Sequence, residues 1–145
     1  MNTGAVIGAI GLALCMSLCG AGSAYGLYKA GSAAAGVVAE DNKKFSKVLI
    51  LALLPATQGI YGFVLAVMKA GSIASVASAG EGWVAFAALL GLGITGLASA
   101  ILQGKTAASC IYAIGKNAEG SGKYVLFPAM VEFYAILALV LGIMI

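Results

Sequence analysis

Four apolar segments, at about residues 4–38, 46–69, 82–115 and 123–145, take up most of this chain. A helix needs about 20 apolar residues to cross a bilayer, and it satisfies its own backbone hydrogen bonds inside the hydrocarbon. Each segment is long enough to span a membrane, and the first and third are long enough to tilt or to extend beyond it. We therefore predict an all-α membrane protein with four transmembrane helices.

The composition excludes several other classes of protein. Of the 145 residues, 62% are hydrophobic and 9% are charged, whereas a soluble domain has roughly 25% charged residues. The chain has no histidine and a net charge of +3, which excludes histidine-based catalysis, a His/Cys metal cluster and a nucleic-acid partner. Because the start of the chain lacks the basic residues of a secretory signal, we expect the first apolar segment to be retained as a helix.

The lysines indicate an orientation. The first loop holds Lys43 and Lys44 and the third holds Lys116 and Lys123, whereas the middle connection, 70–81, holds no lysine. Positively charged loops stay preferentially on the cytoplasmic side of a membrane. We predict a multi-pass protein of the cell (plasma) membrane, with the first and third loops in the cytoplasm and both termini outside.

The two halves of the chain resemble each other. Identical residues recur at a constant offset of 73, namely Gly31 and Gly104, Ala34 and Ala107, Pro55 and Pro128, and Tyr61 and Tyr134. The spacing predicts a duplicated two-helix hairpin, with residues 1–72 forming the first copy and 73–145 the second. The halves differ at one central position, where Gly59 aligns with Glu132, so only the second half keeps a carboxylate.

Glycine distinguishes two kinds of predicted helix. The first and third segments contain eight and six glycines, whereas the second and fourth contain two and one and carry bulky side chains instead. Small residues let membrane helices approach closely. Because thin helices fit an inner circle and bulky helices an outer one, the pattern favours a homo-oligomeric ring. Close packing within a single four-helix bundle is the alternative.

Five polar side chains lie near the middle of the predicted spans. Glu132 stands in the fourth span, where a charge costs on the order of 3 kcal/mol on insertion scales. Thr57, Gln58 and Tyr61 share much of one face of the second span, and Gln103 lies on the third. Because a neutral polar group buried without a partner costs a few kcal/mol, we expect these groups to meet.

The chemistry of this cluster favours a hard monovalent cation. It contains one carboxylate, two amide oxygens, a hydroxyl and a phenol, and Pro55 leaves backbone carbonyls available nearby. Oxygen donors bind hard ions, and one negative charge balances one monovalent cation. A proton would need only the carboxyl group and one partner, so the surplus of oxygens favours Na⁺, with H⁺ as a competing ion.

One motif imitates a nucleotide site. Gly104, Lys105 and Thr106 match the end of a P-loop, but Ser99 stands where the first glycine is required. The motif also lies inside a predicted membrane helix, without a preceding strand. We therefore do not expect the chain itself to hydrolyse ATP.

Three stretches together resemble one family of membrane proteins. Residues 54–62 (LPATQGIYG), 103–105 (QGK) and 128–135 (PAMVEFYA) resemble the proteolipid, or rotor ring, subunit of V-type ATPases. More narrowly, they resemble subunit K of the sodium-translocating bacterial type, over nearly the whole chain. The resemblance implies a non-catalytic subunit of a homo-oligomeric ring that turns in the membrane, driven by ATP hydrolysis in a separate soluble head.

The resemblance also implies roles for individual residues. The Na⁺ ligands would be the Leu54 backbone carbonyl, the Thr57 hydroxyl, the Gln58 and Gln103 side chains and the Glu132 carboxylate. Tyr61 would donate a hydrogen bond to Glu132 and hold the occupied site closed. The implied partners are other copies of the chain, membrane lipid, a stator membrane subunit that supplies an arginine, and a central-stalk subunit on the cytoplasmic side.

Two other functions stay open at this point. A proton-translocating rotor ring would have the same architecture, but Thr57, Gln58 and Gln103 would matter less. A small secondary transporter could also use an intramembrane glutamate for proton exchange. Such a transporter would be expected to form a dimer with a central substrate pocket rather than a large ring.

Overall fold

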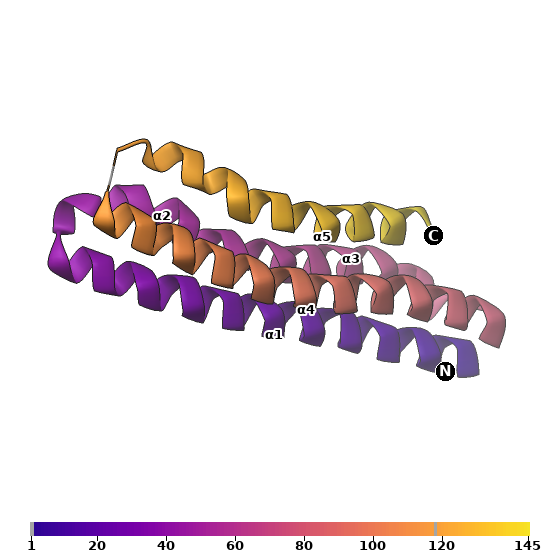
Figure 1. Ribbon diagram of the computed structural model, residues 1–145. Coiled ribbons are helices and arrows are strands. Elements are labelled where there is room, and N and C mark those ends of the chain that lie inside the picture. The colour runs from indigo at the N-terminus through magenta and orange to yellow at the C-terminus, as the bar shows by residue number, and fades with distance from the viewer. Residues whose placement is uncertain (1, 118) are drawn as a thin grey trace.

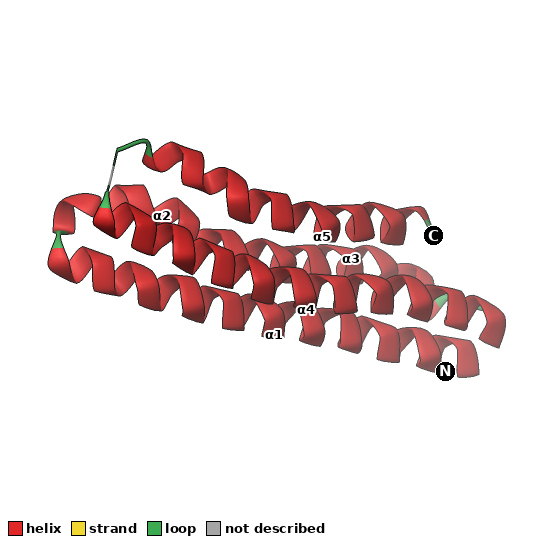
Figure 2. Ribbon diagram, viewed as in Figure 1, coloured by secondary structure: helices red, strands yellow, loops and turns green. Residues whose placement is uncertain are grey.

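The computed structural model describes residues 2–117 and 119–145, and it consists of long helical rods packed side by side (Figure 1). The helices are α1 (Thr3–Glu40), α2 (Phe45–Leu53), α3 (Thr57–Ala74), α4 (Ala79–Lys116) and α5 (Leu126–Met144). Short 3₁₀ turns cover Asn42–Lys44, Leu54–Ala56 and Ser121–Val125. Figure 2 shows loops at the connections between the rods and at the C-terminal end.

Four stretches of the chain are long and apolar enough to cross a membrane, and these are Thr3–Glu40, Asn42–Ala74, Ala79–Lys116 and Ser121–Met144. The second span therefore contains a 3₁₀ turn, α2, a second 3₁₀ turn and α3 in succession. Both termini lie at one end of the molecule, and the α1–α2 and α4–α5 connections lie at the other end (Figure 1). The prediction of an all-α, multi-pass membrane protein with four spanning helices is confirmed.

The connection between the hairpins is shorter than the sequence indicated. We expected residues 70–81 to form it, but α3 continues to Ala74 and α4 begins at Ala79. The start of α4 is fixed by a cap, because the Ser78 hydroxyl accepts a hydrogen bond from the Glu81 N–H at 3.3 Å. The Glu81 carboxylate in turn accepts one from the Ala77 N–H at 3.0 Å.

Glycines bring the backbones of α1 and α4 into contact. A Cβ added to Gly82 would lie 2.4 Å from the carbonyl oxygen of Gly4, and one added to Gly104 would lie 2.3 Å from the Cα of Gly26. These distances leave no room for a side chain, so the small residues serve close helix packing inside the chain. Part of the glycine pattern thus follows from the single bundle, in agreement with the alternative interpretation.

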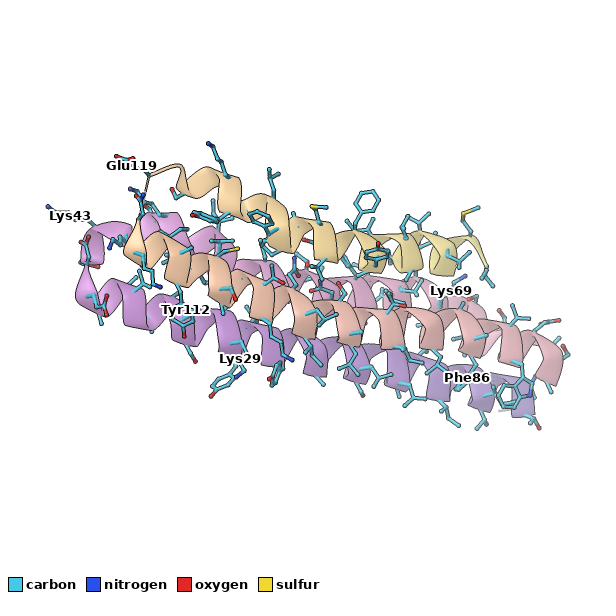
Figure 3. The ribbon with its side chains drawn as sticks, in the orientation of Figure 1. Lys29, Lys43, Lys69, Phe86, Tyr112 and Glu119 are labelled. Atoms are coloured by element: carbon cyan, nitrogen blue, oxygen red, sulfur yellow. The ribbon has the colours of Figure 1, made fainter. Side chains whose placement is uncertain are left out.

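Apolar side chains cover the outside of the rods, and charges lie mostly toward the ends. Phe63 and Phe133 are more than half exposed, as expected for side chains that face lipid. Figure 3 shows Lys43 and Glu119 at the end that holds the α1–α2 and α4–α5 connections, and Lys69 toward the opposite end. The three cysteines, Cys15, Cys19 and Cys110, are free and buried.

Candidate ion-binding site

Polar side chains from three helices converge near the middle of the bundle. Gln58 comes from α3, Gln103 from α4 and Glu132 from α5. The two glutamines are fully buried, and Glu132 is 9% exposed. In the described part of the chain, every buried side-chain nitrogen or oxygen has a hydrogen-bond partner. The cost of placing these groups among apolar helices is therefore offset by their contacts with one another.

The 3₁₀ turn at Leu54–Ala56 gathers three oxygen atoms. Pro55 has no N–H to continue the ladder of α2, so the chain tightens here before α3 begins. The Leu54 carbonyl accepts hydrogen bonds from the backbone N–H and, at 3.0 Å, from the hydroxyl of Thr57. The Oε1 atom of Gln58 lies 3.3 Å from the same hydroxyl. The Leu54 carbonyl, the Thr57 hydroxyl and the Gln58 amide oxygen thus form a compact group.

A chain of amide hydrogen bonds joins this group to the carboxylate. The Nε2 atom of Gln58 donates to the Oε1 atom of Gln103 at 2.7 Å. The Nε2 atom of Gln103 donates to Glu132 Oε2 and to the Pro128 carbonyl, each at 3.1 Å. The network therefore connects α3, α4 and α5 at one depth.

Tyr61 completes the surroundings of the carboxylate. Its hydroxyl donates to Glu132 Oε1 at 2.5 Å, so both carboxylate oxygens accept a hydrogen bond from a neutral donor. Hydrogen bonds to an ionised acceptor are stronger than neutral ones, particularly in surroundings of low dielectric constant. The arrangement is suited to holding a charge that the surrounding helices could not otherwise accommodate.

The structure brings all the residues singled out from the sequence into one cluster, but one of them faces differently than the ligand set implies. Gln103 presents its amide nitrogen to Glu132, and its oxygen accepts from Gln58. To offer an oxygen to an ion beside the carboxylate, the amide of Gln103 would have to turn.

The sequence reasoning overlooked Ser99, which also belongs to the network. Its hydroxyl accepts a hydrogen bond from Gln58 Nε2 at 3.1 Å and donates one to the Val131 carbonyl at 3.0 Å. The available signal was its spacing, because residues four apart lie on one face of a helix and Ser99 precedes Gln103 by four.

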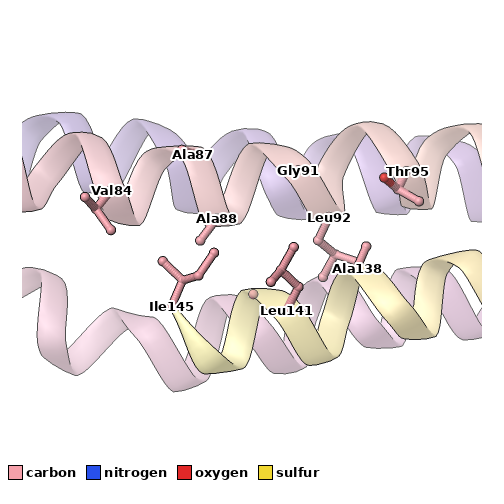
Figure 4. Close-up of a pocket in the computed structure, with 10 residues that line it drawn as sticks. Val84, Ala87, Ala88, Gly91, Leu92, Thr95, Ala138, Leu141 and Ile145 are labelled. Carbon is pink, nitrogen blue, oxygen red and sulfur yellow. The ribbon is translucent and has the colours of Figure 1, made fainter.

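The donor set of the cluster limits what it can bind. Within residues 2–117 and 119–145, no group of three His, Cys, Asp or Glu side chains could hold a metal ion. One carboxylate with neutral oxygens suits a hard monovalent cation or a proton. An apolar groove of about 370 Å³ lies elsewhere, between α4 and α5 (Figure 4). Thr95 provides the only side-chain hydroxyl among its lining residues, so this groove is a poor site for an ion.

Comparisons with known proteins agree with this architecture. The ATP synthase C-subunit family matches the chain twice, at residues 10–69 and 86–145. The V-type sodium ATPase subunit K of Enterococcus hirae is 41% identical over 141 residues, which are 97% of this chain and 90% of the relative. The A-type ATP synthase subunit K of Methanocaldococcus jannaschii is 37% identical over 139 residues, 96% of this chain and 61% of the relative. Each family match covers one pair of spans, which confirms the duplication.

Proposed function

Since the chain belongs to the ATP synthase C-subunit family and is a non-catalytic membrane component of a rotary ATPase, we propose that its ring carries Na⁺ on Glu132 as it turns. The observation that carries the proposal is a cluster of side chains in the middle of the spans. These side chains bear oxygen atoms that could bind a cation, and hydrogen bonds link them to the carboxylate. The proposed ligands are the Leu54 carbonyl, the Thr57 hydroxyl, the side chains of Gln58 and Gln103, and the Glu132 carboxylate.

The surplus of oxygens is the reason to propose Na⁺ rather than H⁺ as the main cargo. Protonation of Glu132 would neutralise it without any contribution from the 3₁₀ turn. The compact group formed by Leu54, Thr57 and Gln58 adds three oxygens, which are linked to the carboxylate through the Gln58 and Gln103 amides. The relative from Enterococcus hirae is a sodium ATPase subunit. A proton-carrying ring of the same family is the alternative, and protons compete with Na⁺ for the same carboxylate.

Binding requires one rearrangement. The amide nitrogen of Gln103 donates one hydrogen to Glu132 and one to the Pro128 carbonyl, and a cation bound at the carboxylate would repel this N–H group. We infer that the Gln103 amide turns as Na⁺ enters, so that its oxygen faces the ion. Its hydrogen bond from Gln58 would then be lost, and the energy of the new ion contact would have to offset that loss.

Charge explains how rotation could be coupled to transport. With Na⁺ bound, the site is neutral and can pass through lipid. Without a cation, Glu132 would bring a net charge into the hydrocarbon, at a cost on the order of 3 kcal/mol or more. Release is therefore expected only where a stator subunit offers water and a countercharge, for which the family resemblance implies an arginine.

Three glycines that are not needed for packing inside the chain support self-assembly into a ring. A Cβ added at Gly31, Gly36 or Gly91 would meet nothing within 4 Å, although all three lie on the glycine-rich helices α1 and α4. Packing inside the chain does not require these positions to be small, whereas close contact with a neighbouring copy would. In the proposed orientation, Lys43 and Lys116 lie in the cytoplasm, where their loops would be accessible to a central-stalk subunit.

Carbodiimide labelling of Glu132 tests the choice of ion. Carbodiimides react with the protonated carboxyl group, so bound Na⁺ should slow labelling at a fixed pH. Slowing by millimolar Na⁺ supports the sodium ring, and labelling that is indifferent to Na⁺ supports the proton ring. The mass of the detergent-solubilised assembly separates both from a secondary transporter, for which a dimer is expected.

A further inference from the structure

Ser99 occupies an unusual place in the network, because it contacts the proposed ligand Gln58 through the amide nitrogen and contacts none of the proposed ligand oxygens. Its side chain is buried, and its hydroxyl bridges two helices other than its own. It accepts from Gln58 Nε2 on α3 and donates to the Val131 carbonyl on α5. Val131 directly precedes Glu132, so the bridge links the helix of Gln58 to the helix of Glu132.

The two hydrogen bonds of Gln58 Nε2 determine which way its amide faces. Both acceptors, Ser99 Oγ and Gln103 Oε1, lie on α4. The amide oxygen consequently points the other way, toward the hydroxyl of Thr57. A reversed amide would place its oxygen against the Gln103 oxygen, and the Ser99 hydroxyl could not donate to it while bonded to Val131.

We propose that Ser99 is a positioning residue that keeps the Gln58 oxygen turned toward the cation; this inference rests on the proposed function. Its contribution matters most when Gln103 turns its own oxygen to the ion. Gln58 then loses one of its two acceptors, and Ser99 is the acceptor that remains. Because the serine bonds to α3 and α5 rather than to the ion, it holds Gln58 with or without cargo.

Ser23 provides a matched control for Ser99. The two serines are 5% and 4% exposed, respectively. The Ser23 hydroxyl accepts a hydrogen bond from the Gly59 N–H at 2.7 Å, one residue from Gln58 in the chain. Replacing either serine by alanine removes a buried hydroxyl that links α3 to another helix, but only Ser99 holds the Gln58 amide.

The experiment measures how much Na⁺ halves the rate of carbodiimide labelling of Glu132 in purified rings. Ser99→Ala should raise that concentration roughly two- to tenfold, the factor that one hydrogen bond corresponds to, and Ser23→Ala should leave it nearly unchanged. Labelling without Na⁺ should proceed at the wild-type rate in Ser23→Ala. The preference for Na⁺ over Li⁺ should also weaken in Ser99→Ala, because a loosened ligand discriminates less between ions of different size.

Equal effects of the two substitutions, or an unchanged Na⁺/Li⁺ preference in Ser99→Ala, would overturn the assignment. If Ser99→Ala rings do not assemble, Ser99→Cys keeps the volume but supplies only a weak hydrogen-bonding group. Ser99→Cys should show the same loss of Na⁺ affinity, and wild-type affinity in that variant would also overturn the assignment. A lack of Na⁺ protection in the wild-type ring would instead refute the proposed sodium transport, and the role of Ser99 with it.

Discussion

At the depth of the ion site, the two halves of the chain carry different residues at aligned positions. In the first half, the bulky helix holds Thr57 and Gln58, whereas the second half has Met130 and Val131 there. Four residues beyond each aligned proline, the second half has Glu132 and the first half has Gly59. On these aligned helices the first half thus carries the neutral groups and the second half the charge, so that one complete cluster requires both hairpins.

The glycine-rich helices have diverged in the same way. Gln103 and Ser99 of α4 align with Ala30 and Gly26 of α1. A Cβ on Gly26 would lie 2.5 Å from the Ala100 carbonyl oxygen, so the first half uses this position for packing and the second half uses it for polar contacts. The two copies thus share the two-helix hairpin, but they differ in the polar side chains that each contributes to the cluster.

Removing the charge should abolish transport completely. Glu132→Gln keeps the size of the side chain and can still accept a hydrogen bond from Tyr61, so rings should assemble. They should neither bind Na⁺ nor react with carbodiimide, and ²²Na⁺ uptake by reconstituted complexes should fall to background. Residual Na⁺ uptake would show that the cargo travels by another route.

Restoring the carboxylate to the first half should not create a second site. Gly59→Glu places a Cβ 3.1 Å from the Ser23 hydroxyl, and the new acid would lack counterparts of Ser99 and Gln103. An unneutralised acid in the span costs on the order of 3 kcal/mol, so the yield and melting temperature of the ring should drop. Gly59→Ala is the matched control and should have a smaller effect; a second labelled carboxylate in stable rings would contradict this account.

The aligned tyrosines should respond very differently to loss of the hydroxyl. Tyr61 bonds to Glu132, whereas Tyr134 is 68% exposed. Tyr61→Phe removes a hydrogen bond to a charged group, so Na⁺ affinity should fall by about tenfold or more. Tyr134→Phe should leave affinity unchanged, and isothermal titration with Na⁺ distinguishes the two. Equal affinities would mean that Tyr61 has no part in holding the ion.

The smallest effect is expected from Thr57, which directly follows the 3₁₀ turn. Thr57→Val deletes the hydroxyl next to the Leu54 carbonyl and the Gln58 oxygen, and should weaken Na⁺ binding by roughly two- to tenfold. The aligned change, Met130→Val, alters a side chain that is 71% exposed, and it should not affect binding. The check is the Na⁺ concentration that halves labelling, and a proton-carrying ring would show no difference between the two variants.

Much of the fold and the membership of the cluster could be predicted from the sequence, because both depend on the cost of exposing polar groups to hydrocarbon. Long apolar runs define the spans, and buried polar side chains such as Gln58 and Gln103 have to find one another. The orientation of the Gln103 amide could not be predicted, since it depends on contacts with two other helices, α3 and α5, at once. The extent of the middle connection was misjudged, because the cap formed by Ser78 is a local detail. Ring assembly, orientation and the choice of Na⁺ stay predictions.

Gly59, which stands where a second carboxylate could be, also affects the number of ions that a rotary motor carries per ATP. If each ATP turns the rotor through a fixed angle, the number of ions carried per ATP depends on how many ion-binding sites lie within that angle. A rotor with one ion-binding site for every four spans has half as many sites as a rotor with the same number of spans in which every two-helix hairpin carries an acid. The free energy of each ATP is then shared among half as many ions, and each ion can be driven against a steeper gradient.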